Sequence, residues 1–427
     1  MFHVSWRRAV GPVLAAILAA SPALVAAQDA LEGTIRVGVV LPEIADHDPL
    51  AAAVIDAANQ GFVMAEEEFA FNAELFELGF EVVTVEAAEG EAAAAAASLV
   101  DEQGAFAVVG GFGLENAEAL GAWAAENNVP FLNIGASSDS LRNETCAATA
   151  FHVVPSAAMY LDAMAGWYVR AGFRQWYVVQ SDDTESAAQN ERLRWTLEER
   201  FFGARIVGES VVAPDAGLEA SVISDIEGSG ADLVILLQDT QDQLASLAAL
   251  EEAGAAAMIG GFPHAETQTR AFFATLYETA PTLNARFRAT AWEATLDAYG
   301  ARELNARFRQ RWEAPMEPSA WAAFQAVKIL YEAAFFGGST EAESVLAYIE
   351  NPQTVFDTWK GIGTTFRSWD RQLRQPVYLI EIDGTATDPF NLALLVGELP
   401  AIYLPGTDPV ERLDQLGDLE DRSTCGQ

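Results

Sequence analysis

Short apolar runs alternate with longer amphipathic stretches along most of the chain. The run TIRVGVVL at 34–41 is rich in β-branched residues and predicts a strand, and the spacing of apolar positions at 56–75 predicts a helix. The same reasoning predicts strands at 80–85, 105–109, 129–132, 175–180, 204–212, 231–237, 256–259 and 377–382. Helices are expected at 90–103, 114–127, 156–171, 186–202, 218–228 and 240–254. Alternation of this kind is typical of parallel sheets with helices on both faces.

The strand–helix series ends near residue 132 and starts again near residue 156. This restart predicts two doubly wound units in an α/β protein, with ligand sites at the carboxyl ends of the strands. Beyond Gly260 the pattern is less regular, and it predicts helices at 266–279, 301–312, 319–336 and 341–350. From Pro405 the chain is polar and acidic, so we expect an extended tail that wraps over the units.

The first 27 residues carry the pattern of an export signal. Arg7 and Arg8 precede an apolar run at 10–20, and small residues lead to a cleavage site after Ala27. The run is short for a helix that spans a membrane. We therefore expect an exported, soluble mature protein.

The charge of the chain limits its partners. The net charge of −38 argues against nucleic-acid binding, which requires a basic surface that neutralises phosphates. Lysine occurs only at Lys328 and Lys360, and arginine supplies the remaining positive charge. An anionic ligand would therefore need a local group of arginines that works against the overall field.

Two cysteines in an exported protein are a candidate disulfide. A bond between Cys146 and Cys425 would enclose almost the whole mature chain and fasten the C-terminal tail. By loop-closure entropy such a bond stabilises by about 5 kcal/mol before strain is subtracted. The alternative is a pair of free thiols.

Motifs of enzymes are missing from the sequence. Gly135 to Asp139 comes nearest to a nucleophile elbow but lacks the closing glycine. No phosphate-binding loop or dinucleotide fingerprint follows the first strand. The histidines after the signal, His47, His152 and His264, are far apart and show no metal-ligand spacing. We expect a binding protein with no enzymatic activity, no catalytic cofactor and no metal.

Long segments of the chain resemble the leucine-binding-protein group of type I periplasmic binding proteins, the receptors of ABC importers. The resemblance lies in residues 34–69, in VPFLNIGASSDSLR at 129–142 and in residues 231–262. It implies a periplasmic protein with two doubly wound, Rossmann-like lobes that are joined by a three-stranded hinge and close around a small ligand. It also implies the division into 28–136 and 256–350 for lobe I, 137–255 and 351–404 for lobe II, and 405–427 for the tail.

Three shorter segments resemble one branch of that group. They are LRNETC at 141–146, residues 305–327 and residues 359–382. The branch is the binding protein of the ABC system associated with alcohol dehydrogenases that depend on pyrroloquinoline quinone (PQQ). The resemblance implies a monomer that binds PQQ, docks on an ABC permease and is linked to the PQQ-dependent dehydrogenase system. The alternatives are a receptor for branched-chain amino acids or another small carboxylate, and a sensing module for a signalling partner.

Candidate ligand contacts follow from the chemistry of PQQ, a flat aromatic tricarboxylate. Guanidinium groups and hydroxyls bind carboxylates, and aromatic rings provide flat walls. The candidates are Ser137, Ser138, Arg142, Phe112, Trp321, Lys360 and Arg367. Asp239 is a candidate on other grounds, because it is an approximate match to the acidic group that the second lobe of leucine-type binders supplies for a ligand ammonium. A surface ion pair is the alternative for Arg142, and a core position is the alternative for Trp321. The loop GGFGL at 110–114 has no hydroxyl where leucine-type binders carry serines, which argues against an amino-acid ligand.

Overall fold

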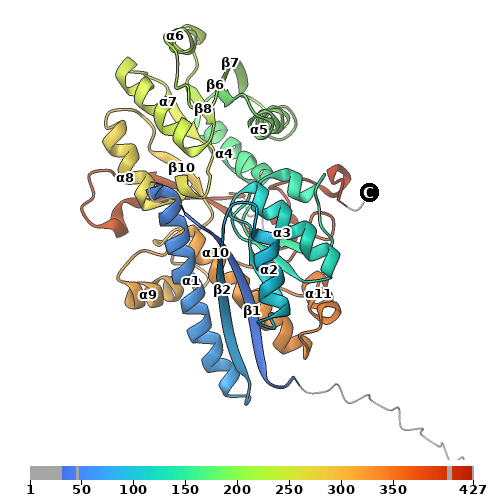
Figure 1. Ribbon diagram of the computed structural model, residues 1–427. Helices are drawn as coiled ribbons and strands as arrows, with labels where there is room; N and C mark the ends of the chain where they lie inside the picture. Colours follow the sequence, from blue (N-terminus) through green and yellow to red (C-terminus); the bar gives the residue numbers. More distant parts are fainter. Residues whose placement is uncertain (1–30, 45–47, 402–405, 426–427) are drawn as a thin grey trace, which may run out of the picture.

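A computed structural model describes residues 31–44, 48–401 and 406–425 (Figure 1). The predicted signal peptide and His47 lie outside the described residues. In the described part of the chain the strands form two parallel sheets and one antiparallel sheet, with helices packed on the parallel sheets. This arrangement confirms the predicted α/β class and the two doubly wound units.

The first parallel sheet has the strand order β2-β1-β3-β4-β5. Its strands are β1 (Thr34–Pro42), β2 (Gly79–Ala87), β3 (Ala107–Gly110), β4 (Phe131–Asn133) and β5 (Ala150–His152). Helices α2 (Ala92–Asp101) and α3 (Leu114–Asn127) share a core with one face of this sheet. The other face is covered by α1 (Pro49–Glu74), α10 (Pro318–Gly337) and α11 (Ala342–Glu350). We call this sheet and its helices lobe I.

The close packing of α1 on α10 depends on Gly61. A Cβ atom at this position would lie 2.2 Å from the Ala320 carbonyl oxygen. Because glycine has no side chain, the two helix backbones approach closely at the start of α10. Asp48 caps the beginning of α1, where its carboxylate accepts from the Ala51 N–H.

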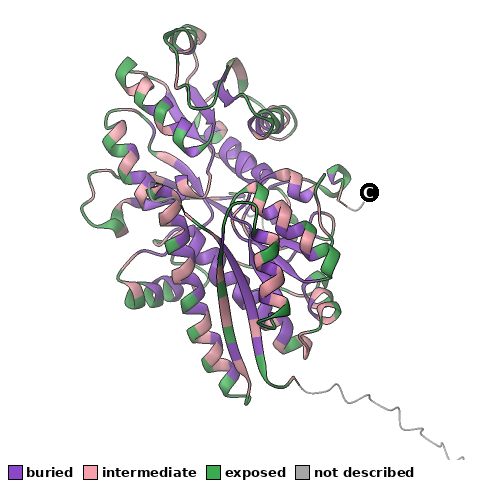
Figure 2. Ribbon diagram, viewed as in Figure 1, coloured by how far each residue is buried: buried purple, intermediate pink, exposed green. Residues whose placement is uncertain are grey.

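The second parallel sheet has the order β7-β6-β8-β9. Its strands are β6 (Gln175–Ser181), β7 (Arg205–Val212), β8 (Leu233–Leu237) and β9 (Met258–Gly261). Around it lie α4 (Ala157–Ala171), α5 (Thr184–Trp195), α6 (Ala220–Ser229), α7 (Thr240–Ala253) and α8 (Arg270–Thr279). Strand β8 is buried along its whole length, as expected for a parallel strand covered on both faces (Figure 2). We call this sheet and its helices lobe II.

An antiparallel sheet completes lobe II. It consists of β10 (Phe287–Thr290), β11 (Val377–Ile382) and β12 (Ala393–Leu399), in that order. Side chains of these strands, among them Ala289, Leu379 and Ile380, belong to the cores of lobe II. The remaining helices are α9 (Ala301–Trp312) and the short α12 (Pro409–Leu413) of the C-terminal tail, residues 406–425.

Three segments of the described chain cross between the lobes. Residues 153–157, 289–292 and 373–377 each begin in the core of one lobe and end in the core of the other. Gln375 ties these segments together, because its Nε2 donates to the Val153 carbonyl oxygen while its Oε1 accepts from Lys360 Nζ. Lys360 Nζ also donates to the Ala291 carbonyl oxygen at 2.6 Å. All three crossing segments therefore meet at one hydrogen-bonded point.

The strand pairing corrects several predicted boundaries. Strand β9 pairs with β8, so the chain does not return to lobe I at residue 256, and Trp292 is where it rejoins the lobe I core. Residues 356–373 also contribute to that core rather than to lobe II. The sequence pattern missed β5, β10 and β12, and the predicted helix at 266–279 begins only at Arg270. No helix of the described chain has the length and hydropathy needed to cross a membrane.

Candidate functional site

A cleft lies between the lobes at the carboxyl ends of their strands. Lobe I contributes residues after β1, β3 and β4, and lobe II contributes residues at the start of α5 and after β9. The cleft has an outer compartment of about 310 Å³ and an inner compartment of about 30 Å³, which share Val54, Phe112, Gly135, Ser137 and Ala265. Parallel α/β sheets place their ligand sites at this edge. A larger hollow of about 520 Å³ is lined only by lobe II residues, and it does not lie at the carboxyl ends of the parallel strands.

The lobe I side of the outer compartment offers hydrogen-bond donors. Gly113 is the N-cap of α3, and no side chain caps the helix. Ser137 and Ser138 lie on the loop that follows β4, and Ser138 Oγ is 3.0 Å from Ser140 Oγ. Free N–H groups at a helix N-terminus together with hydroxyls form a site suited to a carboxylate.

The lobe II side of the outer compartment is acidic. Glu185 and Glu266 line it together with His264. Among the described residues Glu185 has no hydrogen-bond partner, whereas Glu266 Oε2 accepts from Thr240 Oγ1 at 3.3 Å. Burial raises the pKa of Glu185, and the nearby His264 opposes this effect. His264 Nε2 lies 2.9 Å from the Gln238 carbonyl oxygen, which requires the N–H on Nε2.

The inner compartment is mainly apolar with a few polar groups. Its walls include Val54, Phe112 and Val154. Its polar side chains are Ser137, Tyr160, Gln268 and Ser319. Gln268 is fixed, because its Nε2 donates to the Pro263 carbonyl oxygen and its Oε1 accepts from the Ala291 N–H, both at 2.8 Å. Tyr160 Oη pairs with the Gln268 amide, and burial raises the pKa of this phenol.

Three of the predicted ligand residues line the cleft and two others lie elsewhere. Ser137, Ser138 and Phe112 are part of its surface. Trp321 is buried in the core of lobe I, where its Nε1 donates to the Thr358 carbonyl oxygen and its ring stacks on Trp292. Asp239 is an exposed N-cap of α7 whose carboxylate accepts from the Asp242 N–H, and it is not part of the cleft lining.

The predicted cations lie behind the cleft wall. Arg142 is 2% exposed and donates to Gln372 Oε1, to the Ser138 carbonyl oxygen and to the Val154 carbonyl oxygen. Burial lowers its pKa to about 10. Lys360 is buried at the crossing segments, with Nζ over the Trp321 ring, and burial lowers its pKa. Both side chains support the backbone around the cleft and are not part of its surface.

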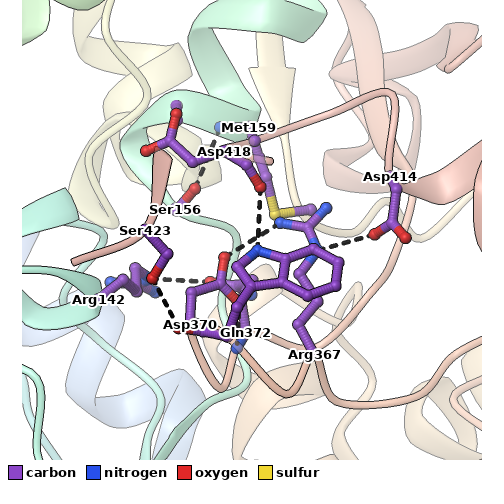
Figure 3. A network of polar contacts seen from close by, with 12 residues as sticks. Arg142, Ser156, Met159, Arg367, Asp370, Gln372, Asp414, Asp418 and Ser423 are labelled. Atoms are coloured by element: carbon purple, nitrogen blue, oxygen red, sulfur yellow. Dashed lines mark hydrogen bonds and ion pairs between the residues drawn. The ribbon is translucent and has the colours of Figure 1, made fainter. Parts of the chain in front are cut away.

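Arg367 belongs to the anchor of the C-terminal tail. Figure 3 shows its side chain near Asp370 and the tail residue Asp414, whose Oδ1 accepts from Arg367 Nε at 2.9 Å. Cys146 and Cys425 are joined in a disulfide with a Cα–Cα distance of 5.3 Å, which confirms the predicted bond. In the described chain no group of three or more His, Cys, Asp or Glu residues could hold a metal ion.

The sequence analysis missed several polar residues of the cleft, namely Tyr160, Glu185, His264, Glu266, Gln268 and Ser319. Glu185 follows the strand end of β6, so the strand-end argument that selected Ser137 could also have selected it. His264 and Glu266 follow β9, but the division implied by the family resemblance assigned this region to lobe I. Ser319 gave no signal, because its position depends on how α10 packs.

Comparisons with known proteins agree with this geometry. A family model described as "Periplasmic binding protein" matches residues 34–387. A periplasmic binding protein from Burkholderia mallei superposes with a TM-score of 0.72 at 18% identity, covering 92% of this chain and 98% of its own. A branched-chain amino acid ABC transporter ligand-binding protein from Burkholderia xenovorans LB400 gives 0.73 at 15% identity, covering 85% and 95%.

An ABC transporter solute-binding protein from R. palustris, solved with benzoate, gives a TM-score of 0.65 at 16% identity. It covers 86% of this chain and 96% of its own. No curated protein matches the chain. The solved structures share the type I periplasmic binding protein fold, in which two lobes flank the ligand.

Proposed function

We propose, from the premise that the chain belongs to the periplasmic binding protein family, that it is the solute receptor of an ABC transporter for a small zwitterionic carboxylic acid. The family is one of non-enzymatic binding proteins. In this proposal the two lobes close around the ligand in the cleft, and the closed form delivers it to a membrane permease.

The observation that carries the proposal is the opposite chemistry of the two sides of the outer compartment. Lobe I presents the N-terminus of α3 with Ser137 and Ser138, which suits a carboxylate. Lobe II presents Glu185 and Glu266, which suit an ammonium group. An α-amino acid carries both groups on one carbon, so it would connect the lobes through its two charges.

The lining does not fit PQQ as well. Among the described residues that line the two compartments there is no arginine and no lysine, whereas two are glutamates. Each of the three PQQ carboxylates would need a positive group or hydrogen-bond donor. The carboxylates would also be repelled by the like charges of the glutamates on the opposite side of the cleft. We therefore favour an amino acid over PQQ, in spite of the hydroxyl-free loop at 110–114, because Ser137 and Ser138 supply the hydroxyls from the next strand end.

The named relatives include a ligand-binding protein of a branched-chain amino acid transporter and one in complex with benzoate. Both names describe small carboxylate-bearing solutes or their transporters. They support a small carboxylate as the ligand class, and the acidic lobe II side favours the zwitterion over a simple anion such as benzoate.

Isothermal titration of the purified protein with a panel of L-amino acids, benzoate and PQQ tests the proposal. We expect saturable binding of at least one amino acid. Replacing Glu185 with glutamine should weaken that binding by about 1.5–3 kcal/mol, because it removes a charged partner of the ammonium. The matched control Glu227→Gln, at an exposed position of α6, should bind like the wild type. Saturable binding of PQQ without binding of any amino acid would overturn the proposal.

A further inference from the structure

Ser319 is a buried hydroxyl without a partner at the inner end of the cleft. Its side chain lines the inner compartment, the residue is 8% exposed, and no described residue accepts from or donates to its Oγ. Two other polar side chains of the compartment, Tyr160 and Gln268, are hydrogen-bonded to each other, and Ser137 lies where the inner and outer compartments join. A buried hydroxyl that stays unpaired costs free energy, so the position calls for a partner from outside the chain.

The backbone around Ser319 also offers donors. Ser319 is the second residue of α10, a helix that begins at Pro318 and has no side-chain cap. The first intrahelical bond at this end runs from the Trp321 N–H to the Glu317 carbonyl oxygen. The N–H groups of Ser319 and Ala320 therefore have no acceptor in the described chain. The N-terminus of a long helix favours an acceptor or a negative charge.

The side chain at the N-cap position of α10, Glu317, bonds to another helix and does not cap α10. The carboxylate of Glu317, at the N-cap position, accepts from the Arg270 N–H at 3.0 Å and from Arg270 Nη1 at 3.1 Å. Arg270 Nη2 donates to Glu293 Oε1 at 2.5 Å. These contacts join α8 of lobe II to α10 of lobe I and keep Glu317 from folding back onto the helix. Among the described residues no side chain therefore caps the start of α10.

We propose that the inner compartment is a subsite for a polar side-chain terminus of the ligand, with Ser319 as the residue that recognises it. The compartment of about 30 Å³ has room for one small group such as a hydroxyl, an amide oxygen or a carboxylate oxygen. The ligand is then an amino acid with a hydrogen-bonding side chain, and aliphatic side chains of the same shape are rejected. This inference rests on the proposed function, because the main-chain groups of the ligand must occupy the outer compartment.

The selectivity has a physical reason. An aliphatic terminus in the inner compartment would leave the buried Ser319 hydroxyl unpaired. A polar terminus of equal volume would satisfy it. Sites built to hydrogen-bond a ligand group discriminate strongly against the analogue that lacks it.

Isosteric ligand pairs test the subsite. Threonine and valine differ in one hydroxyl, and asparagine and leucine differ in one terminal amide. Titration calorimetry of the wild type with all four should show the polar member of at least one pair binding ten-fold or more tightly than its aliphatic partner. In Ser319→Ala that preference should fall by about ten-fold, while the affinity for the aliphatic member stays equal or rises. Ser98→Ala on α2, away from the cleft, should retain the wild-type preference.

A thermal melt separates recognition from a folding effect. Because Ser319 Oγ has no partner in the described chain, Ser319→Ala should melt at or above the temperature of the wild type. Equal affinities within both pairs, or equal losses for all four ligands in Ser319→Ala, would overturn the subsite while leaving the proposed function intact. Failure of every amino acid to bind would overturn both.

Discussion

At the scale of single residues, Arg142 shows how a cation can shape a cleft that it does not enter. Its guanidinium donates to Gln372, 230 positions away in the chain, and to main-chain oxygens of Ser138 and Val154. It thereby fixes the loop that carries Ser137 and Ser138 against the first crossing segment. The planar fork of donors is the reason that an arginine occupies this position.

Removing this guanidinium should lower the stability of the protein. In Arg142→Ala, Gln372 Oε1 and the Ser138 carbonyl oxygen lose this donor, and the Val154 carbonyl oxygen keeps only Gln372 Nε2. The free energy of unfolding should therefore fall by roughly 2–4 kcal/mol. Arg142→Lys should recover little of it, because an ammonium cannot bond all three acceptors in these directions. Urea unfolding without ligand measures the loss. Unchanged unfolding together with weaker ligand binding would instead place Arg142 in direct contact with the ligand.

Asp139 gives the stability a pH dependence. Burial, together with the carboxylate of Asp418, raises the pKa of Asp139 to about 7, while its Oδ1 accepts from the Ala158 N–H at the start of α4. A carboxyl whose pKa is raised in the folded state favours folding when it is protonated. Its contribution is complete below about pH 4 and is lost as the pH rises through about 7.

Asp139→Asn removes this titration but retains the oxygen acceptor. We expect the melting temperature of the variant to match that of the wild type near pH 4 and to exceed it increasingly between pH 4 and pH 8. Thermal melts across this range provide the measurement. Asp139→Ala, which also loses the acceptor, should be less stable than Asp139→Asn at every pH, and a constant difference between wild type and Asp139→Asn would refute the pKa argument.

Residue roles could be predicted only where sequence position determined location. Ser137, Ser138 and Phe112 follow strand ends, so the sheet edge places them in the cleft. Arg142 is also close to a strand end, but its partner Gln372 belongs to a distant segment of the chain. No local sequence pattern predicts a contact between residues so far apart. Trp321 begins a helix that points at the cleft, yet its ring turns into the core.

At the scale of elements, the start of α10 is set by its contact with α1. Gly61 lets the α1 backbone approach the Ala320 backbone closely. This contact helps to fix the position of the neighbouring residue Ser319 at the inner end of the cleft. Long elements such as α1, α3 and β1 could be predicted because their apolar pattern extends over many residues. Short strands such as β5 and β10, with three and four residues, show no such repeat, and their pairing partners decide them.

Gly61→Ala tests this contact. Alanine normally favours a helix over glycine by about 1 kcal/mol, but here its Cβ would overlap the Ala320 carbonyl oxygen, so the net effect should be a loss of roughly 1–3 kcal/mol. The matched control is Gly121→Ala in α3, where the nearest neighbour of a Cβ is Ala147 Cβ at 3.5 Å. That variant should be as stable as the wild type or more stable. Urea unfolding of both variants gives the comparison.

At the scale of the whole molecule, the C-terminal tail connects both lobes. Arg200 on the lobe II side donates to the main-chain oxygens of Gln415 and Gly417, and Asp162 accepts from the Gly417 N–H. On the lobe I side the tail ends in the disulfide to Cys146. The tail is thus a fourth link between the lobes, in addition to the crossing segments. The cysteine count predicted the disulfide, but the bridging role depends on tertiary contacts.

Replacing both cysteines with serine should release this end of the tail. We expect the free energy of unfolding to fall by about 2–5 kcal/mol, because the unfolded chain regains the entropy that the closed loop removes. Unfolding of the double variant, and of the wild type with and without a reductant, measures the effect. Identical unfolding curves for oxidised and reduced wild type would show that the noncovalent contacts alone hold the tail.

The position of Cys425 in the chain also bears on how the molecule is made. Every strand of the three sheets in the described chain precedes it, and its partner lies 279 residues earlier. During synthesis from the N-terminus both lobes can therefore assemble before the bond is able to form. Oxidation then acts on a nearly finished structure. A bond formed in this order retains the finished fold and takes no part in the search for it.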